Sequence, residues 1–217
     1  MTRLAFLARA AVCAAGLLLV AAVPRASADS IGPNCGSCFG SIYTLTDLGL
    51  ATDTHDGDHD MYRIMLSINT ASYTGAGTDY INSVAIKVTD NLETGSLEST
   101  TAPGSWTFHI GGLSNGGCNG NGAGFACAQD GTSAKADGHT YTWIFDLDVA
   151  PGTLLTGSLD ASVKAQYLNS KGGNAGITSE DITLGDAPPT TPVPEPVSAA
   201  LVATGLLFVR RRNSSPR

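Results

Sequence analysis

Apolar and polar residues alternate along much of the chain, which is the pattern of β-strands that bury one face. In the clearest stretch, residues 140–149, five apolar side chains share one face: Tyr141, Trp143, Phe145, Leu147 and Val149. The same alternation predicts further strands at residues 41–46, 61–68, 84–89, 105–110, 159–167 and 177–184. No helical period appears between residues 29 and 186, so the pattern predicts an all-β domain.

The connections between these strands are rich in Gly, Asn, Ser and Thr, and the chain contains 26 glycines. Roughly seven half-polar strands joined by such turns favour an antiparallel β-sandwich or jelly-roll-like fold. Trp106 and Trp143 both fall on apolar faces, so we expect both to point into the core. A single domain at residues 29–186 is long enough to bury that core.

The N-terminus has the features of a secretory signal peptide. Arg3 and Arg9 precede an apolar segment at residues 10–23, and Ala26-Ser27-Ala28 matches a small-x-small cleavage site. Cleavage after Ala28 would remove residues 1–28. We therefore expect the mature chain outside the cytoplasm.

The C-terminus consists of three successive parts. Residues 187–196 contain five prolines and favour an extended linker. Residues 197–209 are uncharged, and as a helix they would span about 20 Å of an apolar layer roughly 30 Å thick. The tail at residues 210–217 begins with Arg210, Arg211 and Arg212, which favour the cytoplasmic side. We predict a short transmembrane helix that is better suited to a temporary tether than to a lasting anchor.

The order Pro194-Glu195-Pro196, apolar segment and arginine cluster resembles the PEP-CTERM sorting signal. Exosortase, a membrane protease of bacteria that make extracellular polysaccharide, recognises and cleaves that signal. The resemblance implies processing by exosortase and an inner-membrane-tethered intermediate. It also implies a final place at the cell surface or in the extracellular matrix of a Gram-negative-type bacterium. An ordinary tail anchor that follows a linker is the alternative interpretation.

Most of the mature chain also resembles a recurrent ectodomain type among PEP-CTERM proteins. The resemblance lies in residues 40–45, 112–127, 142–167 and 179–184. That ectodomain type has no assigned activity. The resemblance therefore implies export and an all-β fold without supplying a mechanism.

The mature domain and the C-terminal tail carry net charges of opposite sign. Residues 29–196 contain five cationic residues and all nineteen acidic ones, a net charge of −14, whereas the whole chain has −7. Such an acidic surface argues against binding to nucleic acid or anionic lipid. It suits divalent cations and a solvated environment outside the cell.

Four cysteines remain after cleavage, and an even number in an exported chain favours disulfides. Of the three possible pairings we favour Cys118 with Cys127, because the glycine-rich segment between them can close, and this leaves Cys35 with Cys38. A redox role for the second pair would need a helix after Cys38, where the sequence predicts a strand. A four-cysteine zinc site lacks the usual ligand spacing.

Acidic residues and histidines crowd the segment that enters the second predicted strand: Asp53, His55, Asp56, Asp58, His59 and Asp60. Carboxylates around a central glycine could supply oxygens to Ca²⁺, although the spacing is not that of an EF-hand. The two histidines could instead bind zinc or nickel. Acidic segments are usually solvated loops, so we predict no resident metal or other cofactor and keep Ca²⁺ as the weaker hypothesis.

Catalytic patterns elsewhere are weak. His109 is expected on the polar face of its strand and His139 at the start of the next, neither with a recognisable partner. Asp146 and Asp148 share one face roughly 7 Å apart, a separation found between glycosidase carboxylates. We interpret both as outward-facing residues of a solvated sheet. Residues 111–124 lack the lysine and the helix of a phosphate-binding loop, so we predict a surface loop pinned by a disulfide.

Together these patterns predict a non-enzymatic exported protein with a structural or adhesive role. A carbohydrate-binding module that binds extracellular polysaccharide is the alternative, although only Tyr73, Tyr80 and Phe125 are left to stack on sugars. A secreted hydrolase is the third hypothesis. It would need His109 or His139 beside a carboxylate and a hydroxyl.

Overall fold

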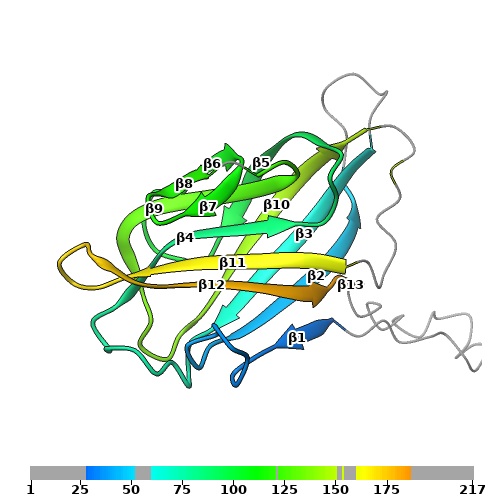
Figure 1. The fold of residues 1–217 in the computed structure, drawn as a ribbon. Helices are drawn as coiled ribbons and strands as arrows, with labels where there is room; N and C mark the ends of the chain where they lie inside the picture. The colour runs from blue at the N-terminus through cyan, green and yellow to red at the C-terminus, as the bar shows by residue number, and fades with distance from the viewer. Residues whose placement is uncertain (1–27, 52–59, 121, 151–152, 154–159, 187–217) are drawn as a thin grey trace, which may run out of the picture. The chain divides into compact units, whose positions relative to one another are not determined.

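The computed structural model describes residues 28–51, 60–120, 122–150, 153 and 160–186. All regular structure in these residues is β, which confirms the predicted class (Figure 1). The chain divides into two compact units, Met1–Ala187 and Pro188–Arg217, so every described residue belongs to the first unit. No helix in the described part is long and apolar enough to cross a membrane. The predicted signal peptide up to residue 27 and the three C-terminal parts lie outside the described residues.

The first layer, sheet A, has the strand order β1-β2-β3-β10-β5. Its strands are β1 (Asp29–Ile31), β2 (Ile42–Leu50), β3 (Asp60–Asn69), β10 (Thr140–Val149) and β5 (Leu92–Thr100). These neighbours are antiparallel, and β13 (Gly185–Asp186) adds a short parallel pairing to β2. Strands distant in sequence thus become neighbours, because β10 pairs with both β3 and β5.

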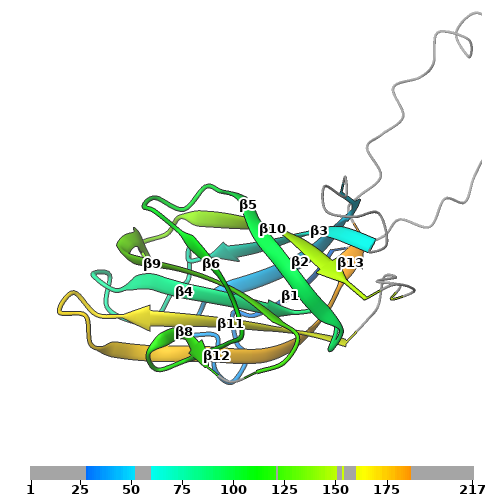
Figure 2. The same ribbon diagram turned by 90° about the horizontal axis from the view of Figure 1, so that it is seen from above.

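The second layer, sheet B, has the strand order β12-β11-β4-β9-β6 and is antiparallel throughout. Its strands are β12 (Asn174–Thr183), β11 (Asp160–Leu168), β4 (Tyr80–Lys87), β9 (Phe125–Lys135) and β6 (Thr107–Ile110). Figures 1 and 2 show the two sheets as facing layers. The predicted antiparallel sandwich is therefore confirmed.

The apolar faces of the two sheets meet in one core. Trp143 and Phe145 of β10 are fully buried there with Ile86 of β4 and Val163 of β11. Burying each such side chain stabilises the fold by about 1.5 to 3 kcal/mol. Trp106 is only partly buried but packs edge-on against Trp143, with ring centroids 5.0 Å apart. Both tryptophans therefore face the core, as predicted.

Two long strands, β5 and β9, lack the alternation of apolar and polar residues that predicts the other long strands. At the edge of sheet A, β5 has mostly polar side chains, and the register shifts where it pairs with β10. In sheet B, β9 lies between β4 and β6 and buries small residues such as Ala126 and Ala128 instead of the β-branched residues typical of strands. These two strands are therefore recognised only from their pairing with neighbouring strands, and not from the sequence pattern.

The glycine-rich segment at residues 111–124 is pinned by the Cys118–Cys127 disulfide, as predicted, but its described residues contain a small two-stranded ribbon where the sequence predicts a plain surface loop. It contains β7 (Gly112–Ser114) and β8 (Gly117–Gly120), which pair with each other. Leu113 and Cys118 of this ribbon pack with Phe125 and Ala85 of sheet B in a second, smaller apolar cluster. The ribbon therefore covers part of the outer face of sheet B.

Candidate functional site

A hollow of about 420 Å³ opens on the outer face of sheet A, over β3, β10 and β5. Strand pairing creates it, because Asp146 of β10 lies opposite Arg63 of β3 and Ser96 of β5. Two residues further along β10, Asp148 lies opposite Met61 and Thr94. Alternate residues of a strand share a face, so both aspartates line the same hollow.

The two aspartates share one face of the sheet, as predicted, but the prediction that they are solvated is wrong. Asp146 is 7% exposed and Asp148 only 3%. Arg63 donates from Nε to Oδ1 and from Nη2 to Oδ2 of Asp146, both at 2.7 Å. Such a bidentate salt bridge offsets the free-energy cost of burying the carboxylate. The hydrogen bonds to Asp146 also raise the pKa of Arg63.

The rims of the hollow differ in polarity. On the β5 side lie the hydroxyls of Thr94 and Ser96 and the carboxylate of Glu98, whose side chain is 50% exposed. On the other side lie Leu50, which is 69% exposed, and Ala51. The lining contains three carboxylates, on Asp146, Asp148 and Glu98, against the one guanidinium of Arg63, a net charge of −2. It can hold a ligand that combines an apolar face with hydrogen-bonding groups.

The sequence could have suggested Arg63 as a functional residue but did not reveal its partner. Arg63 is the one arginine between residues 29 and 196, and it occupies a polar position of a predicted strand. Its pairing with Asp146 joins residues 83 positions apart. The pairing register of strands so far apart in sequence depends on the tertiary structure. For the same reason, the sequence does not reveal that Glu98 lies 3.8 Å from Arg63 Nη2.

Both favoured disulfides are present. Cys118 and Cys127 join the ribbon to β9, with Cα atoms 5.7 Å apart, and Cys35 and Cys38 close a turn, with Cα atoms 5.3 Å apart. The chain continues from that turn directly into β2 and not into a helix, so the local structure is unlike a thioredoxin-type site. Disulfides form and persist in oxidising compartments, which indicates an exported protein.

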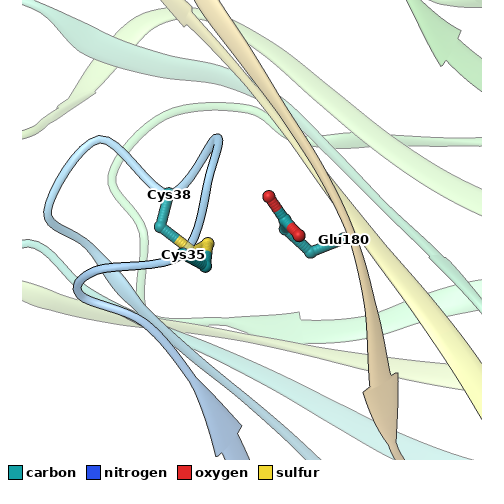
Figure 3. A group of neighbouring side chains, drawn as sticks. All are labelled: Cys35, Cys38 and Glu180. Carbon is teal, nitrogen blue, oxygen red and sulfur yellow. A yellow bond between two sulfur atoms is a disulfide. The ribbon is translucent and has the colours of Figure 1, made fainter.

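Glu180 of β12 points toward the Cys35–Cys38 disulfide (Figure 3). The two sulfurs and a carboxylate oxygen of Glu180 lie within 4.8 Å of one another, a spacing that could hold a metal ion. Because the sulfurs are bonded to each other, however, they are not available as thiolates. The group is a disulfide beside a carboxylate.

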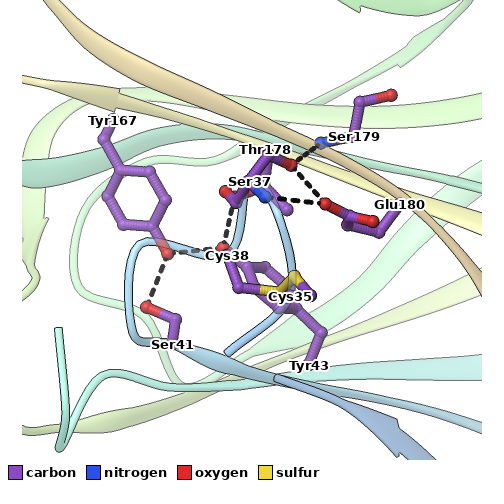
Figure 4. The surroundings of a disulfide bond; sticks show 9 residues. All are labelled: Cys35, Ser37, Cys38, Ser41, Tyr43, Tyr167, Thr178, Ser179 and Glu180. Carbon is purple, nitrogen blue, oxygen red and sulfur yellow. Dashed lines mark hydrogen bonds between the residues drawn. A yellow bond between two sulfur atoms is a disulfide. The ribbon is translucent and has the colours of Figure 1, made fainter. Parts of the chain in front are cut away.

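The turn between these cysteines instead binds the edge of sheet B. Ser37 donates from both its backbone N and its Oγ to Glu180, at 2.8 and 2.7 Å. Its Oγ accepts from the backbone N of Ser179, and its carbonyl accepts from Thr178 Oγ1 (Figure 4). The turn thus fastens the segment before β2 to β12, the edge strand of sheet B.

A buried hydroxyl network lies beneath this turn. The hydroxyls of Tyr43 and Tyr167 are 2.7 Å apart, Tyr43 also contacts Thr178, and Tyr167 donates to Ser41. Burial raises the pKa of Tyr167 to about 12, although its hydrogen bonds to Ser41 and Tyr43 oppose the rise. Burial also raises the pKa of Tyr43, and the neighbouring Tyr167 adds to that effect. We interpret the network as structural, because it joins the two sheets.

The two histidines among the described residues do not line the hollow. His109 is exposed on β6, and His139 is exposed just before β10, where its Nδ1 lies 2.6 Å from Asp137 Oδ1. The hydrogen bond from His139 lowers the pKa of Asp137. Thr70 Oγ1 donates a 2.8 Å hydrogen bond to His139, but to its backbone carbonyl and not to the imidazole, so this contact does not complete a Ser-His-Asp arrangement.

The candidate metal-binding segment, for which Ca²⁺ is the weaker hypothesis, lies almost entirely beyond the described part of the chain. Asp53, His55, Asp56, Asp58 and His59 lie outside the described residues, and only the backbone of Asp60 is described, as the first residue of β3. The Ca²⁺ hypothesis for this segment therefore stays a prediction.

No family model matches this chain, and no curated protein does. Among solved structures, a similar chain is the major pilin subunit of Bacillus cereus, at 10% identity and a TM-score of 0.24. The match covers 67% of this chain and 40% of the pilin subunit. At that level of similarity we draw no functional conclusion from it.

Proposed function

We propose that this is an exported protein that exosortase sorts and cleaves, and that it acts as a non-enzymatic structural or adhesive component of the cell surface or extracellular matrix. The observation that carries the proposal is the order of Pro194-Glu195-Pro196, an uncharged apolar segment and Arg210-Arg211-Arg212. Each part has a physical role: an extended spacer, a short membrane segment and a cationic stop.

Two features of the folded domain support this proposal. Its two disulfides suit an oxidising compartment outside the cytoplasm. The charge of −14 on residues 29–196 contrasts with the arginine-rich tail, so the two sides of Pro196 suit opposite sides of a membrane.

The proposal is tested by replacing Pro194, Glu195 and Pro196 with alanine in a host that makes exosortase. We expect the wild-type chain to lose its C-terminal segment and to leave the inner membrane. The triple variant should keep the full C-terminus and stay in the membrane fraction. Intact mass spectrometry of fractionated cells distinguishes the two forms.

A matched control replaces Pro188, Pro189 and Pro192 of the same linker, which should leave processing unchanged. Wild-type chain that stays uncleaved in the presence of exosortase would contradict the sorting proposal. So would equal cleavage with and without exosortase.

A second candidate function, binding of extracellular polysaccharide, is favoured by the hollow on sheet A. Its volume of about 420 Å³ is within the range of small-ligand sites, and its lining offers hydroxyls, carboxylates and a guanidinium. A glycan array probed with the purified secreted protein tests this function. Binding no stronger than background on every glycan would exclude it.

A further inference from the structure

We propose that the hollow on sheet A binds a saccharide unit that bears a protonated amine. This inference rests on the proposed placement of the protein in a polysaccharide matrix and adds the chemical class of ligand. It follows from three properties of the lining: charge, polarity and pre-organisation.

The net negative charge of the lining disfavours anionic ligands. With three carboxylates and one guanidinium in its lining, the hollow repels uronate, sulfate and phosphate groups. The positive charge of Arg63 is already directed to Asp146 through two hydrogen bonds, so it offers little attraction to an anion. A cationic group is favoured instead, and among polysaccharide units an amino sugar supplies one.

Polarity suits a sugar ring. Met61, Ala51 and the exposed Leu50 form an apolar side against which the C–H face of a ring can pack. Thr94, Ser96 and Glu98 on β5 offer hydroxyl and carboxylate groups to the ring hydroxyls and the amine. The hollow therefore presents an apolar surface and a polar surface to opposite parts of one sugar unit.

The site is also pre-organised. Arg63 donates one hydrogen bond to each carboxylate oxygen of Asp146, and both residues belong to paired strands in the interior of the sheet. Side chains on rigid strands lose little freedom when a ligand binds, which favours affinity. Glu98 is the adaptable group, because half of its side chain is exposed.

The test uses the full-length exported protein and three soluble oligosaccharides: a deacetylated amino-sugar oligomer, its N-acetylated counterpart and an oligouronate. Calorimetric titration at mildly acidic pH keeps the amine of the deacetylated oligomer protonated. We expect the deacetylated oligomer to bind best and its affinity to fall as salt is added. Equal affinity for the N-acetylated oligomer, a preference for the uronate or no binding at all would overturn the proposal.

Two variants locate the binding in the hollow. Ser96→Tyr places a bulky side chain over the hollow from an exposed position of the edge strand β5, and it should abolish binding. Glu98→Gln removes one exposed charge and should weaken binding about fivefold, as expected for a partly exposed ion pair. Unchanged affinity in both variants would contradict the assigned position.

Asp137→Asn is the matched control. It removes one charge at the other end of β10, whose Thr140 lies eight residue steps from Asp148, a distance of roughly 26 Å along the strand. Its affinity should equal that of the wild type, and an equal loss would reveal general attraction to an acidic surface instead of a site. C-terminal cleavage is measured separately, so failure of sugar binding is distinguishable from failure of sorting.

Discussion

At the scale of single residues, Asp146 shows how a carboxylate on the outer face of a sheet can be almost fully shielded from solvent by a partly exposed arginine, Arg63. Asp146 is 7% exposed, and the guanidinium meets it with two hydrogen bonds of 2.7 Å. Among the described residues that line the hollow, Arg63 is the only cation that compensates this carboxylate, because Glu98 and Asp148 carry the same sign as Asp146. Removing the arginine should therefore cost more than an ordinary surface substitution.

We predict that Arg63→Met lowers the free energy of unfolding by about 1 to 3 kcal/mol. The cost is below that of a fully buried pair because the Arg63 side chain is 38% exposed. Urea denaturation of the purified protein measures the change. Adding Asp146→Leu to this variant should restore part of the loss, since no buried charge is then left unpaired.

Glu98→Gln is the control for this prediction, because Glu98 lies 3.8 Å from the same guanidinium but is half exposed. It should change stability by less than about 0.5 kcal/mol. Equal costs for Arg63→Met and Glu98→Gln would show that burial of Asp146 has no energetic consequence.

The buried tyrosines predict a loss of stability at alkaline pH. Tyrosine in an unfolded chain has a pKa of about 10, whereas burial raises the pKa of Tyr167 to about 12. Between these values the unfolded chain releases a proton that the folded chain keeps, so stability falls as pH rises through that window and is unaffected below it. The Tyr167 contribution is on the order of 2 to 3 kcal/mol at the top of the window.

Tyr167→Phe tests this assignment. The variant should be less stable at neutral pH by about 1 kcal/mol, because Ser41 and Tyr43 lose a hydrogen-bond partner. From pH about 10 to about 12 its stability should decline less steeply than that of the wild type. Parallel declines in the two proteins would assign the alkaline transition to other groups.

At the scale of elements, the two disulfides fasten different parts of the sandwich. Cys118–Cys127 holds the β7–β8 ribbon on the outer face of sheet B. Cys35–Cys38 shapes the turn whose Ser37 binds the β12 edge. Their removal should therefore expose different backbone amides.

We predict that Cys118→Ala with Cys127→Ala lowers stability by about 2 to 3 kcal/mol, and Cys35→Ala with Cys38→Ala by about 2 kcal/mol, because the second loop is shorter. Hydrogen exchange followed by mass spectrometry should show faster exchange at residues 112–120 in the first variant. In the second, exchange should be faster around Ser37 and Ser179. Faster exchange in the same region in both variants would contradict these separate roles.

At the scale of the whole molecule, the dominant property is charge. Residues 29–196 have a net charge of −14, and self-repulsion of this size opposes the compact state. Raising the salt concentration from about 0.01 M to about 0.15 M shortens the screening length from roughly 30 Å to about 8 Å. Repulsion between distant carboxylates then weakens.

We predict that Tm rises over this salt range by about 2 to 4 °C, equivalent to about 1 kcal/mol in a domain of this size. Calorimetric melting in sodium chloride measures the shift. A Tm that stays constant or falls would mean that short-range pairs such as Arg63–Asp146 outweigh the general repulsion.

How much the sequence predicts depends on the kind of strand. The strands at residues 61–68 and 140–149 are predicted nearly to the residue, because strands with one buried face carry strict alternation. In contrast, β5 at a sheet edge and the alanine-rich β9 have no comparable pattern. Their structure is set by the partners they pair with.

The candidate site divides in the same way. Asp146 and Asp148 could be assigned to one face from their spacing, whereas their burial, the pairing with Arg63 and the rim from β5 could not. These depend on a register between strands that are distant in sequence, and the local pattern contains no information about it.

By itself, the sequence determined the all-β class through its local periodicity and the acidic charge of the mature domain through its composition. It determined the favoured disulfide pairing as well, because each pair of cysteines closes a short loop. It also supplies the sorting hypothesis, which rests on residues 194–212 alone. Only the tertiary structure decided that β10 lies between β3 and β5, and with that the existence of the hollow. The physical reason is that contacts between distant strands are selected by the packing of the whole core and not by any one segment.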